Sequence, residues 1–224
     1  MSNFVAGLDL AQANDWTALV ICEHLQRHIG FAQGPIRDDE GFVAGYKTVE
    51  RLEDVFHVVH AQRWRGTAYP VLVDTLTDLL RRPPLAGQTD LVVDATGVGR
   101  PVLDLLDAAK RSGALDTWAR PVTITAGLVE GAGTVPKYAL VQAVEVALQT
   151  GRLRIADGLP LAPVLREELL NFQAKVSPTG HARFEAAGAG HDDLVVALAL
   201  AVFRRPRLLG DPSRIDPEGR MWRH

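Results

Sequence analysis

Cysteine is nearly absent from this sequence, which contains one, Cys22, among 224 residues. A single thiol cannot form an intramolecular disulfide, and it cannot build a zinc site from several cysteines. The chain therefore fits a reducing compartment, and we expect it in the cytoplasm. Cys22 lies in the apolar run "ALVIC", which indicates a buried side chain rather than a reactive thiol.

The sequence also lacks a surplus of positive charge and long hydrophobic runs. Its 24 lysines and arginines stand against 27 acidic residues, so the net charge is −3. Any binding of nucleic acid must then depend on local patches or on bound metal. No stretch reaches the roughly 18 apolar residues of a membrane span, and the start "MSNFVAGLDLAQ" lacks the basic residues and apolar core of a signal peptide. We therefore expect no association with a membrane.

The apolar runs predict strands first and then alternating helices and strands. Short runs with β-branched residues favour strands, and apolar residues at helical spacing favour helices. The expected strands cover 4–11, 15–24, 55–64, 89–97, 119–127, 152–156 and 181–186, and the expected helices cover 69–82, 98–113, 135–151, 159–176 (running into a strand) and 191–203. Residues 25–53 are expected to form an irregular excursion with at most a short strand pair. This order is typical of an α/β fold with a mixed sheet.

The length suits one domain, which we place at residues 1–203. Residues 204–224 are rich in arginine and interrupted by prolines and glycines. Such a composition favours a solvated, mobile tail.

Carboxylates stand at places where packing does not require them. Asp9 and Asp94 each end an apolar strand, and ligands of open α/β sheets bind at that edge. After His191, the final helix opens with Asp192 and Asp193, of which one is explained as a cap, whereas two adjacent charges repel each other. Mg²⁺ and Mn²⁺ prefer oxygen ligands. The residues alone support two interpretations equally: scattered caps, or a metal site that joins both strand ends to the helix start.

Two further features are weaker. Asp15, just beyond a tight connection after Asp9, is either a turn residue or a second carboxylate near that site. In "DATGVGRP", glycines before a helix could expose N–H groups to a phosphate, but neither G-x-x-x-x-G-K-[ST] nor G-x-G-x-x-G is present. We interpret Gly97 and Gly99 as a tight turn that positions Asp94.

Four segments in this order resemble one family: "GLDLAQANDWTALVI", "LVVDATGVGRPVLDLL", "VPKYALVQAVEVALQTGRLRI" and "GHDDLVVALALAV". They are similar to the nuclease domain of phage large terminase subunits, which cut concatemeric viral DNA during genome packaging. The resemblance covers residues 4 to about 203 and implies an RNase H-like fold, with a central mixed β-sheet flanked by helices on both faces. It also implies that Asp9, Asp94 and Asp192/Asp193 bind metal, with Asp15 at a further acidic position of some members.

The resemblance further implies hydrolysis of a DNA phosphodiester bond with two Mg²⁺ or Mn²⁺ ions, about 4 Å apart and bridged by a carboxylate, here Asp9. His191 would either move a proton or bond only to backbone at the helix entry. Double-stranded DNA would be held through its phosphates, with little sequence specificity. The cations expected to do this are Arg63, Arg65, Arg100, Lys137 and the arginine-rich tail, although each alone is more often an ordinary surface charge.

The chain has neither the length nor the Walker A loop of a large terminase with its ATPase motor. We therefore expect a nuclease domain cut from a longer protein, or a stand-alone phage or prophage nuclease in a bacterial host cell. A terminase motor, a small terminase or a portal protein would be its partners. The alternatives are a Holliday-junction resolvase, an inactive DNA- or portal-binding domain, and an actin-like ATPase or sugar kinase. The last would use "GLDLA" and "VVDATGVG" as phosphate loops, but it needs two such domains and a longer chain.

Overall fold

The computed structural model describes residues 3–11, 15–38, 40–97, 99–127, 133–176, 182–186 and 191–208. Within them, one sheet has the strand order β6-β5-β4-β1-β2-β3-β7. β1 pairs antiparallel with β2 and parallel with β4, so the sheet is mixed, as predicted. Its strands are β1 Phe4–Asp9, β2 Trp16–Arg37, β3 Val43–Arg65, β4 Thr89–Asp94, β5 Ala119–Thr125, β6 Thr134–Pro136 and β7 Leu153–Ile155. A separate pair is formed by β8 (Phe172–Val176) and β9 (Ala182–Ala186).

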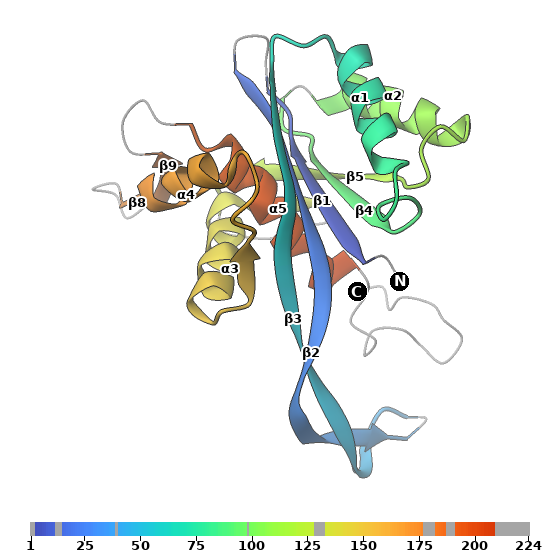
Figure 1. Ribbon diagram of the computed structural model, residues 1–224. Helices are drawn as coiled ribbons and strands as arrows, with labels where there is room; N and C mark the ends of the chain where they lie inside the picture. The colour runs from blue at the N-terminus through green and yellow to red at the C-terminus, as the bar shows by residue number, and fades with distance from the viewer. Residues whose placement is uncertain are drawn as a thin grey trace.

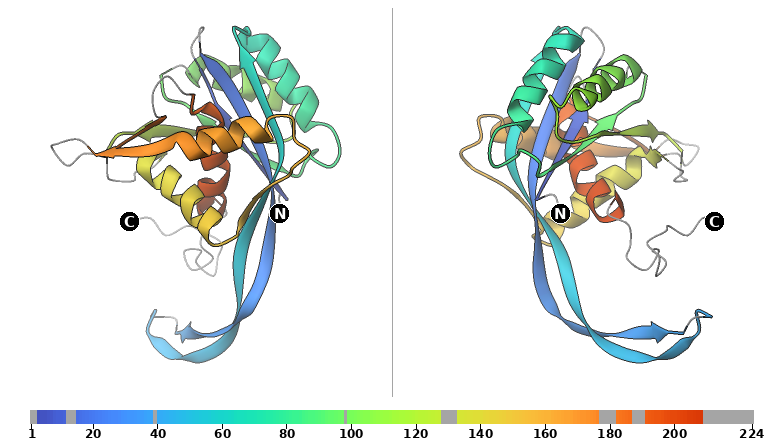
Figure 2. Two further views of the ribbon diagram at one scale, coloured as in Figure 1. Left: turned by 60° about the vertical axis from the view of Figure 1, so that its left-hand side comes forward. Right: turned by 90° about the vertical axis from the view of Figure 1, so that its right-hand side faces the viewer.

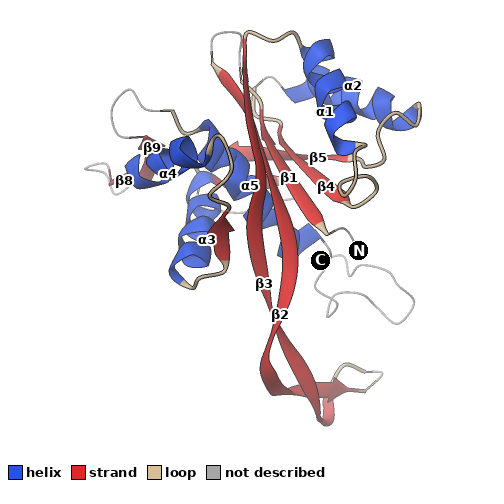
Figure 3. Cartoon of the chain, viewed as in Figure 1, coloured by secondary structure: helices blue, strands red, loops and turns tan. Residues whose placement is uncertain are grey.

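Helices cover both faces of the sheet, which confirms the predicted layers (Figures 1 and 3). The bounds are α1 Tyr69–Leu80 and α2 Gly99–Arg111 on one face, and α3 Lys137–Gln149, α4 Ala162–Asn171 and α5 Asp193–Leu208 on the other. Alternate residues of β1 enter the two cores: Ala6 and Leu8 pack with α1 and α2, and Val5 packs with α5. This burial on both faces explains why the central strands are continuous apolar runs rather than alternating ones.

β1 and α5 are in direct backbone contact at Gly7. A Cβ atom there would lie 1.9 Å from the carbonyl oxygen of Ala197 and 3.0 Å from the amide nitrogen of Ala201. Only glycine allows strand and helix to approach so closely. Because Asp9 ends this strand and Asp193 begins this helix, the contact helps to set the distance between them.

The prediction of an irregular excursion at residues 25–53 is wrong. β2 and β3 pair along their length, from Trp16 to Arg37, with register shifts at three places. The outer part of this ribbon curves away from the body of the molecule (Figure 2). Its glycines and its proline at residues 30–35 gave it the composition of a loop. A ribbon of two strands tolerates them because each strand has one edge without a partner.

The last helix is longer than predicted. α5 continues to Leu208, whereas the sequence predicted an end near residue 203. Residues 209–224, which make up most of the predicted mobile tail, lie outside the described residues. The boundary between domain and tail therefore stays a prediction.

Two predictions about apolar segments can be compared directly with the structure. The Cys22 thiol is fully buried, so the predicted burial of this side chain is confirmed, and burial raises its pKa to about 12. None of the helices in the described part of the chain is long and apolar enough to cross a membrane.

Replacing Gly7 by alanine should destabilise the protein, because the new methyl group overlaps the backbone of Ala197. Overpacking of this kind costs about 1–3 kcal/mol or more, which a urea unfolding curve would show as a lower midpoint. Gly45→Ala in β3 is the control, since its nearest atom, on Ile36, is 3.9 Å away. If Gly7→Ala unfolds like the control, the close contact between β1 and α5 is not present.

Candidate metal centre

The two strand-end aspartates and the start of α5 meet at one edge of the sheet. β1 and β4 are parallel neighbours, so Asp9 and Asp94 end side by side at the carboxyl edge of the sheet. Burial is the main cause of the raised pKa of Asp9, and the charges of Asp94, Asp193 and Asp192 raise it further, which indicates that the start of α5 lies near the end of β1. The fold thus brings aspartates from three distant places in the sequence to the same edge of the sheet.

The cluster carries negative charge that the protein compensates only in part. Burial is the largest cause of the raised pKa values of Asp9, Asp94 and Asp193. Repulsion from the other carboxylates raises the pKa of Asp9 further, and Lys137 lowers it. Poorly hydrated carboxylate oxygens are the ligands that Mg²⁺ and Mn²⁺ prefer, and a divalent cation would remove the repulsion. The donor set therefore fits a metal ion of this class.

A threonine holds the Asp94 carboxylate in place. The N–H and hydroxyl groups of Thr96 donate to Asp94 Oδ1 at 2.8 and 2.5 Å. The same hydroxyl oxygen accepts the N–H of Ile124 at 2.9 Å, which ties the loop to β5. Gly97 follows with a φ of +83°, which favours glycine and agrees with a tight turn before α2.

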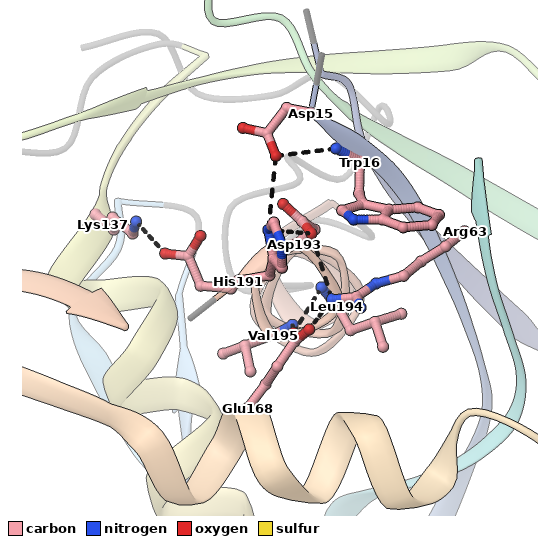
Figure 4. Close-up of polar contacts among 10 residues, drawn as sticks. Asp15, Trp16, Arg63, Lys137, Glu168, His191, Asp193, Leu194 and Val195 are labelled. Carbon is pink, nitrogen blue, oxygen red and sulfur yellow. Dashed lines mark hydrogen bonds and ion pairs between the residues drawn. The ribbon is translucent and has the colours of Figure 1, made fainter. Parts of the chain in front are cut away.

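The start of α5 is bonded to Glu168, a residue that the sequence analysis did not identify. Glu168 Oε2 accepts the N–H groups of Leu194 and Val195 at 3.0 and 3.2 Å (Figure 4). These two N–H groups are therefore capped from α4 and not by the aspartates of "HDD". The available signal was the position of Glu168 three residues after the buried Leu165, on the inner face of α4.

Two cations predicted to contact DNA lie against the acidic cluster instead. Arg63 forms ion pairs with Glu168 and, at 3.3 Å, with Asp193. Lys137, the first residue of α3, donates to Asp192 Oδ2 at 2.7 Å. Their contacts with DNA remain predictions. Part of their positive charge is already balanced by ion pairs with Asp193 and Asp192.

Two further predicted cations are exposed, whereas the side chains of the predicted arginine-rich tail lie outside the described residues. Arg65 lies at the surface with its guanidinium 5.7 Å from the centre of the Trp16 ring, and Arg100 is exposed in the first turn of α2. Both arginines can contact a phosphate without breaking an ion pair with a buried carboxylate.

Asp15, His191 and Asp193 form a second, adjoining group of donors. His191 Nδ1 lies 3.7 Å from Asp15 Oδ1 and 3.9 Å from Asp193 Oδ2 (Figure 4). One ligand atom from each residue can be chosen so that all lie within 4.8 Å of one another. Asp193 therefore belongs to this group of donors, and after burial and the charge of Asp94 it also contributes to the raised pKa of Asp9.

The family model of the terminase RNase H-like domain matches residues 6–205. None of the curated proteins compared with the chain is a significant match. The family match favours the nuclease interpretation over the actin-like or sugar-kinase alternative, in agreement with the four segments that carried the resemblance.

Solved structures with a similar fold are viral terminase domains. The large terminase nuclease from thermophilic phage G20c with bound magnesium is 20% identical and has a TM-score of 0.56, covering 90% of this chain and 80% of that one. The Thermus phage P74-26 large terminase nuclease domain is 17% identical, with a TM-score of 0.55 and coverage of 91% and 80%. The Mn-soaked human cytomegalovirus terminase nuclease domain is 11% identical, with a TM-score of 0.50 and coverage of 92% and 84%. At these identities the likeness concerns the fold, and it confirms the predicted RNase H-like fold.

Asp9→Asn should raise the stability of the metal-free protein at neutral pH. Folding raises the pKa of Asp9 above its ordinary value of 3.8, so the contribution of this group is most favourable below that pH and is lost as the pH rises through the raised pKa. The neutral amide removes this cost at pH 7, and each kcal/mol regained adds about 2–4 °C to the melting temperature.

Thermal unfolding at pH 7 and pH 4 in EDTA measures this effect. We expect the gain at pH 7 to shrink at pH 4, and we expect no gain from Asp78→Asn, an exposed aspartate on α1. A melting temperature lowered by Asp9→Asn at pH 7 would show that the Asp9 carboxylate is not a source of strain in the metal-free state.

Proposed function

We propose that this chain, which belongs to the terminase RNase H-like domain family, is a divalent-metal-dependent endonuclease that hydrolyses phosphodiester bonds in double-stranded DNA. The observation that carries the proposal is the position of Asp9 and Asp94 at the ends of adjacent parallel strands, near Asp192 and Asp193 at the start of α5. Burial raises the pKa of Asp9, Asp94 and Asp193. We propose that the enzyme acts in the bacterial cytoplasm, during packaging of a viral or prophage genome.

The metal would be Mg²⁺ or Mn²⁺, and the proposed number of ions is two. Asp9, Asp94, Asp192 and Asp193 would hold the metal, with Asp15 as a further carboxylate nearby. When bound, such ions activate water and stabilise the leaving oxygen. This proposal draws support from the magnesium-bound terminase nuclease of phage G20c, which shares the fold.

The surrounding residues orient these carboxylates. Thr96 fixes Oδ1 of Asp94 through its N–H and hydroxyl groups. Lys137 holds Asp192 and adds a positive charge beside the place where a scissile phosphate would lie. His191, half exposed and adjacent to Asp15 and Asp193, is placed to pass a proton to or from solvent.

DNA would be held mainly through its phosphates. Arg65 and Arg100 are the exposed candidates on this side of the fold, and Arg63 and Lys137 add charge from within the site. Phosphate contacts position a duplex without reading its sequence, so we propose low sequence specificity. A terminase motor, a small terminase or a portal protein would then select where the chain cuts. Residues 1–203 would suffice for the nuclease itself.

Nicking of a supercoiled plasmid in Mg²⁺, in Mn²⁺ and in EDTA tests the proposal. We expect cutting with either metal and none in EDTA. Replacing residues that only orient a metal ligand typically costs 10–100-fold, so Asp94→Ala should lower the rate at least about 100-fold. Asp104→Ala, an exposed aspartate on α2, is the matched control and should cut at the wild-type rate.

Cutting that persists in EDTA, or an Asp94→Ala variant as active as wild type, would contradict the proposed site. A four-way DNA junction supplied beside linear duplex separates the proposed activity from that of a junction resolvase. Preferential cutting of the junction would favour the resolvase.

A further inference from the structure

Glu168 is a buried carboxylate outside the acidic cluster, and each of its two oxygens contacts a different partner. It is 6% exposed, on α4. Its Oε2 accepts two N–H groups at the start of α5, and its Oε1 contacts the guanidinium of Arg63. A charge this deep in the protein is tolerated only with such compensation.

Arg63 is shared between two carboxylates through the same nitrogen. Its Nη2 contacts Glu168 Oε1 closely and lies 3.3 Å from Asp193 Oδ2. The three side chains are between 6% and 11% exposed, so solvent screens them little. One positive charge thus stands against two negative charges, and one negative charge remains in the trio.

The geometry points to Glu168 as a positioning residue that holds Arg63 away from full pairing with Asp193 and so keeps the Asp193 carboxylate available to a divalent cation. This inference rests on the proposed metal site. Arginine and a carboxylate tend to pair through two parallel hydrogen bonds. Without the charge of Glu168, Arg63 would pair with Asp193 in this way, neutralise it and compete with the metal for its oxygens.

Capping of α5 requires only a hydrogen-bond acceptor at residue 168, whereas holding Arg63 requires a negative charge there. An uncharged amide oxygen can still accept the N–H groups of Leu194 and Val195. It cannot balance the guanidinium of Arg63. Glu168→Gln therefore keeps a cap for the helix and removes the restraint on the arginine.

Isothermal titration of the whole chain with Mn²⁺ alone tests this role. We expect Glu168→Gln to bind Mn²⁺ about tenfold more weakly than wild type. Adding Arg63→Met to Glu168→Gln should return the affinity to within about threefold of wild type, because the competing cation is then gone. A purely structural role for Glu168 would not produce this rescue.

The controls are matched by position. Glu167→Gln changes the preceding, exposed residue of α4, and Arg51→Met changes an exposed arginine of the same strand as Arg63. Both should bind Mn²⁺ within about twofold of wild type. Wild-type affinity in Glu168→Gln, or a double variant as weak as Glu168→Gln, would overturn the inference.

Circular dichroism establishes whether each variant folds. If Glu168→Gln does not fold, Arg63→Met alone decides: the inference expects it to bind Mn²⁺ at least as tightly as wild type, and weaker binding overturns it. Wild-type protein that neither binds Mn²⁺ nor cuts DNA would contradict the proposed function itself. Wild-type protein that does both, beside an unchanged Glu168→Gln, contradicts only the role of Glu168.

Discussion

Burial of the carboxylates of Asp9, Asp94 and Asp193 near one edge of the sheet is the constraint on which the rest of this structure depends. Asp9 and Asp94 end adjacent parallel strands, and Asp192 and Asp193 precede or begin the helix that crosses behind them. Burial raises the pKa of Asp9, Asp94 and Asp193, and the charges of the other three aspartates raise that of Asp9 further, so ionising these groups costs free energy. Tolerance of such a cost is typical of functional sites, where strain persists because the surrounding structure over-determines it.

Several contacts hold the carboxylates against this repulsion. Gly7 lets β1 and α5 touch, so the end of the strand and the start of the helix stay close. Thr96 ties Asp94 to the neighbouring strand, Lys137 pairs with Asp192, and Arg63 lies between Glu168 and Asp193. Each restraint comes from a different element of the fold. The chain has a net charge of −3, and the acidic cluster alone would repel DNA. A divalent cation bound there would make the local potential positive and so allow a phosphate to approach.

The sequence predicted the elements that bury apolar surface and missed those whose role depends on distant partners. The apolar runs "FVAGLD" and "LVVD" predicted strands that end at Asp9 and Asp94, and β1 and β4 end at these residues. The long ribbon was missed because its pairing compensates for a loop-like composition. Glu168 was missed, and Arg63 and Lys137 were interpreted as surface cations, because a single sequence does not show which charges the fold brings together. The residues alone left scattered caps and a shared metal site equally supported, and the resemblance to terminase nuclease domains favoured the shared site.

The central claim is that these aspartates form one divalent-metal site. The most direct measurement is a crystal of the wild-type chain soaked in Mn²⁺, with anomalous diffraction recorded above the manganese edge. The account predicts anomalous density between the carboxylates of Asp9, Asp94 and Asp192/Asp193, and its loss in crystals of Asp9→Asn. Density found only elsewhere, or none at millimolar Mn²⁺, would contradict it.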